Sequence, residues 1–226
     1  MSQAQLPFDL GHVPTYALDE FLEADGNAEA LARVTDWSGW PHPACGLIGP
    51  AGCGKTHLAH VFCDLSGGLR LDAGALTTEL VPELAEAPAV ALEDADRGVD
   101  ETALFHLYNL MKENRRRLLL TARLAPSRWP VALADLRSRL ATVPLAMILP
   151  PDDSLIGSVL LKLFSDRQLA VTPDVIAFIL TRMERSFDSA RALVAGIDAA
   201  SLAQHRRITV PLVRDLLPHF SQSRET

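Results

Sequence analysis

The pattern G-x-x-x-x-G-K-T stands at residues 49–56, and its residue types are those that hold a polyphosphate. Its glycines let consecutive backbone N–H groups turn toward one point without Cβ clashes, which makes an anion site at the start of a helix. A lysine in this position reaches the β- and γ-phosphates, and the hydroxyl that follows it ligates Mg²⁺. We therefore predict that ATP or ADP with Mg²⁺ binds to Gly49, Pro50, Ala51, Gly52, Cys53, Gly54, Lys55 and Thr56.

Further polar residues follow two apolar runs downstream. Glu93 and Asp94 come directly after the buried run 89–92, and Thr121 ends the run 118–121. A carboxylate at such a strand end can hold Mg²⁺ through water, while its neighbour polarises the attacking water. A threonine hydroxyl there can bond the γ-phosphate or that water. We predict Thr56 and Glu93 as the Mg²⁺ residues and Glu93, Asp94 and Thr121 as catalytic, with a solvated acidic turn as the alternative.

Composition describes an ordinary soluble protein. The 226 residues are 48% hydrophobic and 22% charged, which is enough for one good core with a small second lobe, or for two small domains. No apolar run approaches the roughly 20 residues that span a bilayer, and no secretory signal is visible, so the expected location is the cytoplasm, away from a membrane. The net charge of −7 disfavours strong direct DNA binding, and three cysteines without C-x-x-C spacing favour reduced thiols over a metal site or disulfides.

Strand-like and helical patterns alternate through the first two thirds of the chain. The strand-like runs are 44–48, 69–72, 89–92, 118–121 and 146–149, with a helical stripe of Leu76, Leu80 and Leu84 and a basic run, 112–117, at the end of another helix. Such alternation predicts an α/β fold with a parallel sheet flanked by helices and a ligand crevice at the carboxyl ends of the strands. From residue 152 onward only helical periodicity occurs, at 155–164, 173–183, 186–203 and 210–217. We predict a nucleotide-binding domain over 12–150 and a small all-helical lid over 151–226.

The order of phosphate loop, acidic strand end, polar strand end and helical lid resembles that of the AAA+ P-loop ATPases. More finely, residues 12–217 resemble the family of the replication initiator DnaA and its short regulatory homologues of the Hda type. Residues 54–58 and His60 resemble the G-K-T-H-L-L-H run of that family, which adds His57 to the predicted nucleotide-binding residues. Residues 136–140 resemble the segment with the arginine finger, with Arg139 in the finger position and Arg137 as its competitor. Tyr16, Phe21 and Asn27 resemble the region that leads to the adenine pocket.

The first residues carry a separate resemblance. Residues 3–8 are similar to the short peptide with which many replication proteins bind the sliding clamp, with Gln3, Leu6 and Phe8 as the contact residues. A flexible peptide that offers one amide and two apolar anchors suits an apolar surface pocket. The resemblance therefore implies a clamp-binding peptide at 1–11, and a disordered start is the alternative.

The resemblance implies a nucleotide-bound regulator. It would bind the sliding clamp of DNA polymerase III, stimulate hydrolysis of DnaA-bound ATP, with Arg139 acting on the ATP of the partner, and so prevent re-initiation of replication. A homo-oligomer is a further assembly that the resemblance allows. Glu93 replaces the usual magnesium-binding aspartate, and Asp188 stands where the family has its sensor arginine. Arg191, three residues on, is the predicted nucleotide-binding residue of this helix. Intrinsic hydrolysis should therefore be weak; an autonomous ATPase such as a DnaC-like helicase loader and a nucleotide-stabilised adaptor are the alternatives.

Overall fold

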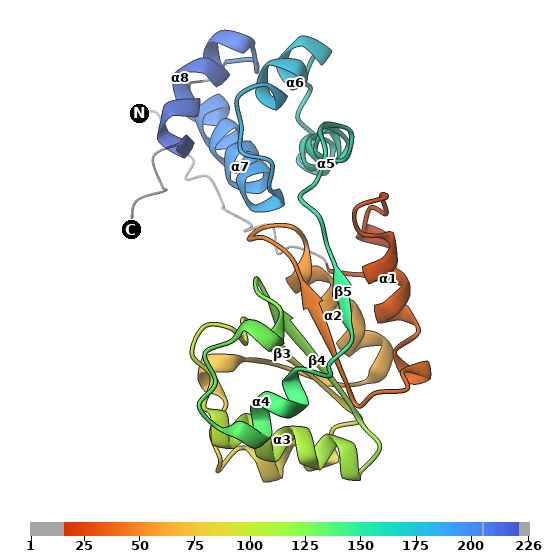
Figure 1. Cartoon of the computed structure of the whole chain (residues 1–226). Helices are drawn as coiled ribbons and strands as arrows, with labels where there is room; N and C mark the ends of the chain where they lie inside the picture. Colours follow the sequence, from red (N-terminus) through yellow and green to blue (C-terminus); the bar gives the residue numbers. More distant parts are fainter. Residues whose placement is uncertain (1–15, 205, 222–226) are drawn as a thin grey trace, which may run out of the picture.

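The computed structural model describes residues 16–204 and 206–221, and within them one parallel sheet lies under a group of helices (Figure 1). The sheet has the strand order β2-β3-β4-β1-β5. Its strands are β1 (Ala44–Ile48), β2 (Leu69–Asp72), β3 (Ala89–Glu93), β4 (Arg117–Ala122) and β5 (Leu145–Met147). Every neighbouring pair runs parallel, so all carboxyl ends, including those of β1, β3 and β4, share one edge.

Alternation along the strands divides the core of this domain in two. Ile48 and Leu120 belong to a cluster packed against α3 (Glu101–Glu113) and α4 (Ala134–Leu140). Leu47 and Leu119, one residue away, belong to a cluster with α1 (Ala28–Thr35) and α2 (Lys55–Ser66). Successive side chains on a strand point to opposite faces, and both faces here are covered by helices. The predicted α/β fold with helices on both sides of a parallel sheet is confirmed.

The helical lid follows β5. Its helices are α5 (Asp153–Asp166), α6 (Pro173–Leu180), α7 (Phe187–Gln204) and α8 (Val210–Ser221), and they enclose a core of their own that includes Leu160, Phe164 and Leu193. The Asp152 carboxylate caps α5 by accepting the Leu155 N–H at 2.7 Å, which satisfies a donor that the helix leaves free. Figure 1 shows these helices beyond the loop that follows β1. Among the residues that the structure describes, no helix is both long and apolar enough to cross a membrane.

The helix predicted from the leucine stripe at residues 76–84 is wrong. Short 3₁₀ segments, η3 (Ala73–Ala75) and η4 (Val81–Glu86), occupy this stretch instead. The Asp72 carboxylate accepts the Gly74 N–H at 2.8 Å and so turns the chain directly after β2, and Pro82 lacks the N–H that an α-helix would need. Leu76 and Leu84 are buried nonetheless, so their hydrophobic side chains reflect packing against the core and not the face of a helix.

Two further boundaries differ from the sequence prediction. The last strand ends at Met147, because the Leu149 N–H bonds the Gly26 carbonyl at 2.9 Å instead of continuing along β1. The basic run ends a helix only in part: α3 ends at Glu113 with Lys112 in its last turn, whereas Arg117 already belongs to β4. Arg116 donates to the carbonyls of Ala85 and Ala87, and so it caps the segment η4 instead. The remaining short 3₁₀ segments are η1 (Leu18–Glu20), η2 (Trp37–Gly39) and η5 (Pro126–Arg128).

Candidate nucleotide-binding site

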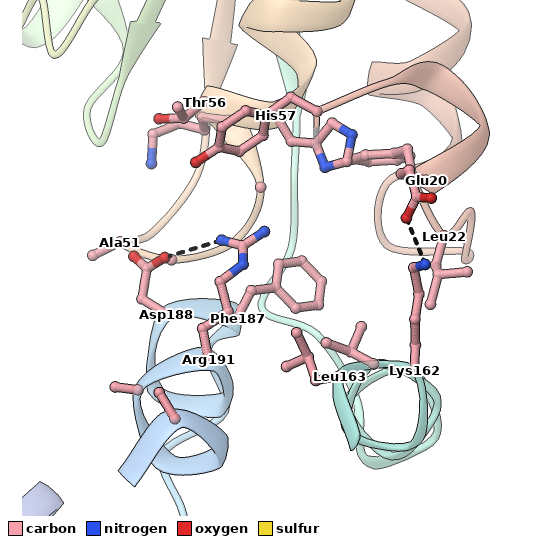
Figure 2. A pocket seen from close by; sticks show the side chains of 18 of the residues that line it. Glu20, Leu22, Ala51, Thr56, His57, Lys162, Leu163, Phe187, Asp188 and Arg191 are labelled. Atoms are coloured by element: carbon pink, nitrogen blue, oxygen red, sulfur yellow. Dashed lines mark hydrogen bonds and ion pairs between the residues drawn. The ribbon is translucent and has the colours of Figure 1, made fainter. Parts of the chain in front are cut away.

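A cavity of about 900 Å³ lies between the carboxyl edge of the sheet and the lid (Figure 2). The loop after β1 and the start of α2 form one wall, and α5 and α7 form the other. Three groups of residues line it: Tyr16, Glu20, Phe21 and Leu22 from the N-terminal segment; Ala51, Gly52, Gly54, Lys55, Thr56, His57, Asp94, Arg97 and Arg123 from the sheet domain; and Val159, Lys162, Leu163, Asp166, Arg167, Phe187, Asp188, Arg191, Ala192 and Ala195 from the lid. Both domains therefore contribute to one site.

The phosphate loop owes its shape to its glycines. Gly52 and Gly54 have φ angles of +66° and +105°, which side chains with a Cβ rarely adopt. Helix α2 begins directly afterwards at Lys55, so its free N–H groups and the positive end of its dipole face the loop. The Lys55 ammonium donates to the carbonyls of Gly49 at 2.9 Å and Pro50 at 2.7 Å, inside the curve of the loop. This arrangement suits a polyphosphate.

The predicted loop residues divide by position. Ala51, Gly52, Gly54, Lys55 and Thr56 line the cavity, whereas Gly49 and Pro50 contribute the carbonyls that hold Lys55. Cys53 points away from the cavity and lines a smaller one of about 230 Å³. Burial raises the pKa of its thiol, which keeps it protonated. Cys53 therefore supports the loop from beneath.

The candidate magnesium residues lie next to each other. The Thr56 hydroxyl donates to Glu93 Oε2 at 2.6 Å, and Arg70 donates to Glu93 Oε1 at 2.5 Å. Hydroxyl and carboxylate oxygens are ligands that Mg²⁺ accepts, so Thr56 and Glu93 fit this ion. In the described part of the chain, no group of three or more His, Cys, Asp or Glu side chains is placed to hold a metal. An ion at Thr56 would thus take most of its ligands from phosphate and water.

Asp94 and Thr121 occupy different places. Asp94 lines the cavity, pairs with Arg97 at 3.0 Å, and has a φ angle of +53° at the turn after β3. Thr121 is 1% exposed and does not line the cavity. Its hydroxyl accepts the Asp94 N–H at 3.1 Å. Thr121 therefore holds the backbone of Asp94 in place, rather than facing a phosphate as the sequence prediction had it.

Aromatic side chains line the part of the cavity near the N-terminal segment. The rings of Tyr16 and His60 stack at 4.2 Å with an interplanar angle of 8°, and Phe21 meets His57 edge-on at 5.2 Å. His57 Nε2 lies 3.0 Å from the Ala17 carbonyl oxygen, so His57 anchors this segment as well as lining the cavity. Burial lowers its pKa. These flat apolar surfaces suit the adenine base.

Asn27 lies in the segment that leads to the cavity. It does not line the main cavity but the smaller one. Its side chain accepts the Ala24 N–H at 2.8 Å and donates to the Leu22 carbonyl at 3.0 Å. Asn27 thus shapes the turn that leads into α1.

The lid reaches the phosphate loop directly. The Phe187 N–H donates to the Gly52 carbonyl at 2.8 Å, and the side chain of Asp188 lies beside the loop, as Figure 2 shows next to Ala51. Arg191 lies 3.5 Å from Asp188, and its guanidinium carbon is 5.9 Å from the centre of the Tyr16 ring. On the other side of the cavity, Lys162 of α5 pairs with Glu20 at 2.5 Å (Figure 2). This pair could not be predicted from the sequence, because isolated charges on helices are common on surfaces.

Comparison with known proteins agrees with this geometry. A family model described as "Hda, lid domain" matches residues 158–217. Domain III of the Thermotoga maritima replication initiation protein DnaA superposes with a TM-score of 0.79 at 17% identity, over 97% of this chain and 100% of that one. This chain therefore has a DnaA-like AAA+ fold with a lid of the Hda type.

Other solved AAA+ structures are similar too. AMPPCP-bound DnaA from Aquifex aeolicus gives a TM-score of 0.68 at 17% identity, over 85% of this chain and 66% of that one. The Thermotoga maritima RuvB Holliday junction branch migration motor gives 0.73 at 16% identity, over 91% and 72%. At such identities the likeness concerns the fold, and the function has to be argued from the residues.

The arginine candidates of this AAA+ module lie outside its own cavity. Arg139 and Arg137 are both on α4, and neither lines the cavity. The Arg139 guanidinium carbon lies 4.4 Å from the centre of the Phe105 ring, and its Nη1 donates to the Asp135 carbonyl at 3.0 Å. The Arg137 side chain is the more exposed of the two. Neither arginine is therefore placed to contact a nucleotide in this chain's own cavity.

Proposed function

We propose that this chain is a nucleotide-bound regulator that stimulates hydrolysis of DnaA-bound ATP and so prevents re-initiation of DNA replication. The observation that carries this proposal is a phosphate loop and an acidic strand end enclosed in one cavity by a lid of the Hda type. A resemblance to the lid alone would leave open whether nucleotide is involved. The cavity supports an adenine nucleotide as part of the working protein.

In this proposal ATP or ADP is bound by the chain itself. Lys55 offsets the polyphosphate charge, the loop N–H groups orient the phosphates, and Tyr16 and Phe21 cover the base. Mg²⁺ held near Thr56 and Glu93 would neutralise charge on the phosphate oxygens. Asp188 brings negative charge to the place where the family has an arginine, so intrinsic hydrolysis is expected to be slow.

Stimulation of DnaA requires an arginine that reaches into the partner's site. By the resemblance, Arg139 stands in the finger position, and its guanidinium lies against the Phe105 ring of α3 and donates to the Asp135 carbonyl of its own helix. Arginine fingers contribute about 10³ to 10⁵ in rate by stabilising charge in the transition state. On a helix, Arg137 points about 200° away from Arg139, so one of the two acts, not both.

The sliding clamp is the second partner in this proposal. The residues proposed to bind it, Gln3, Leu6 and Phe8, lie outside the residues that the structure describes. Support comes from the sequence pattern, which offers one amide and two apolar anchors for a surface pocket. Clamp binding would bring the regulator to newly replicated DNA without a strong DNA contact of its own.

The test is a phosphate-release assay with ATP-bound DnaA and clamp loaded on DNA. Arg139→Ala should lower the stimulated rate by about 10³ while ADP binding is kept, and Arg137→Ala should retain the rate. Replacing Gln3, Leu6 and Phe8 with alanine should abolish binding to the clamp, and with it the clamp-dependent stimulation. Nucleotide affinity should not change. Full activity of both arginine variants would refute the finger mechanism.

The same assay separates the alternatives. Steady phosphate release without DnaA would identify an autonomous ATPase such as a helicase loader. Clamp binding with no effect on DnaA in any variant would identify an adaptor that uses nucleotide for stability.

A further inference from the structure

The carboxylate that ends β3 already has a cationic partner. Glu93 is 7% exposed, and its two oxygens are engaged by the Thr56 hydroxyl at 2.6 Å and the Arg70 guanidinium at 2.5 Å. Arg70 pairs in register with Ala91, two residues before Glu93, so Arg70 and Glu93 share one face of the sheet. The extra methylene of glutamate relative to aspartate lets the carboxylate reach both partners.

Other charged groups nearby leave this pair intact. Asp72 lies opposite Glu93 in the register but uses its carboxylate to accept the Gly74 N–H at 2.8 Å. His60 stacks on Tyr16, and burial together with the charge of Arg70 lowers its pKa, which keeps it neutral. The Arg70 and Glu93 charges therefore largely cancel at the place where the family's carboxylate meets Mg²⁺.

The Arg70 guanidinium, bonded to Glu93, opposes a second cation at the same carboxylate. Even at the dielectric constant of water, a guanidinium within about 6 Å of a divalent ion lowers the affinity for that ion by about tenfold. Glu93 cannot turn away from Arg70 without leaving a buried carboxylate with one partner fewer. Arg70, on the neighbouring strand β2, would thus weaken the binding of Mg²⁺ at Thr56 and Glu93.

We propose that Arg70 is a positioning residue that holds Glu93 and makes nucleotide binding by this chain nearly independent of Mg²⁺. The inference rests on the proposed function, since it assumes that nucleotide binds in the cavity. Its consequence is a regulator that keeps its nucleotide when free Mg²⁺ varies and that is poorly equipped to hydrolyse it.

The test is calorimetric titration of the full chain with ADP, once with excess Mg²⁺ and once with EDTA. The wild-type dissociation constants should differ by less than about threefold between the two conditions, and Arg70→Gln should raise this difference by about tenfold. Arg70→Lys, which keeps the charge, should behave as wild type. Arg97→Gln is the matched control, because it removes a cation that lines the cavity and pairs with Asp94 and not with Glu93.

Each outcome decides. An equal gain from Mg²⁺ in wild type and Arg70→Gln overturns the inference, and so does an Arg70→Lys variant that behaves like Arg70→Gln. A tenfold rise in Arg97→Gln would show that any cation of the cavity has this effect, which also overturns it. Absence of ADP binding by the wild type under both conditions overturns the proposed function itself.

Discussion

Asp188 sets the charge at the mouth of the phosphate loop. Asp188 Oδ2 lies so close to the phosphate loop that a Cβ added to Gly52 would be 3.2 Å from it. The other oxygen, Oδ1, is 3.5 Å from Nη1 of Arg191, the nearest cation on the same helix. A triphosphate carries more negative charge into this place than a diphosphate. Repulsion between two unit charges about 4 Å apart in water costs about 1 kcal/mol, or about fivefold in affinity.

Asp188→Asn should therefore raise affinity for a non-hydrolysable ATP analogue by about fivefold, with ADP affinity changed much less. Both dissociation constants can be measured by calorimetry. Asp166→Asn is the matched control: it removes a carboxylate from the same cavity, beside Lys162 on the opposite side, and should leave the ratio of the two constants unchanged. Equal gains for both nucleotides in Asp188→Asn would contradict this role.

Residues that act within a short stretch of chain were predictable. The phosphate loop needs glycines and a lysine at fixed spacing, and Glu93 and Asp94 follow a buried strand directly. The residue types and their spacing therefore predict the site. The contact of Arg70 with Glu93 was not predictable, because the two residues lie on the neighbouring strands β2 and β3 and are 23 positions apart in the sequence. The Lys162–Glu20 pair likewise depends on how the lid sits over the N-terminal segment.

Among the elements, strands were easier to predict than the segments between them. The buried strands β1, β3 and β4 each contain a run of at least three consecutive apolar residues, which is typical of parallel strands covered on both faces. The spacing of Leu76, Leu80 and Leu84 wrongly predicted an α-helix. The same spacing is compatible with a chain that forms 3₁₀ turns and packs on the α3 side of the sheet. Local bonds from Asp72 and the position of Pro82 decide between the two.

The segment before α1 is held to α2 through a histidine, which makes its docking sensitive to pH. Burial lowers the pKa of His57 from the ordinary 6.5, so the folded state favours the neutral ring. Above that value the ring is neutral whether the chain is folded or not, and the free energy of unfolding does not depend on it. As pH falls below 6.5, the unfolded chain takes up the proton first, and stability decreases until the folded ring is protonated as well.

We expect the unfolding temperature of the nucleotide-free chain to fall between pH 7.5 and 5.5, with a smaller fall in His57→Gln. Differential scanning calorimetry across this range measures it. His106→Gln serves as the control, because that histidine is exposed on α3 and remote from the N-terminal segment. If His57→Gln shows the same decrease as wild type, His57 is not the group that titrates.

At the scale of the whole molecule, the cavity is the place where the sheet domain and the lid meet. The polar contacts across it include the bond from the Phe187 N–H to the Gly52 carbonyl and the pair of Lys162 with Glu20. Each domain has a hydrophobic core of its own. A ligand that touches both walls would therefore add contacts between the two domains, and so couple their arrangement to nucleotide.

Bound ADP should accordingly stabilise the whole chain. At a concentration of about 100 times its dissociation constant, a ligand that binds only the folded state adds about 2.7 kcal/mol. For a chain of this size, that corresponds to an increase of about 5 to 10 °C in the unfolding temperature.

Lys55→Ala should abolish this increase, because it removes the ammonium that the loop holds at 2.9 and 2.7 Å from its own carbonyl oxygens. Lys112→Ala removes an exposed lysine of α3 and should keep it. Since Lys55 is itself buried, its loss can lower the unfolding temperature without ligand, so the quantity compared is the increase on adding ADP. An undiminished increase in Lys55→Ala would show that nucleotide stabilises the protein from somewhere other than this cavity.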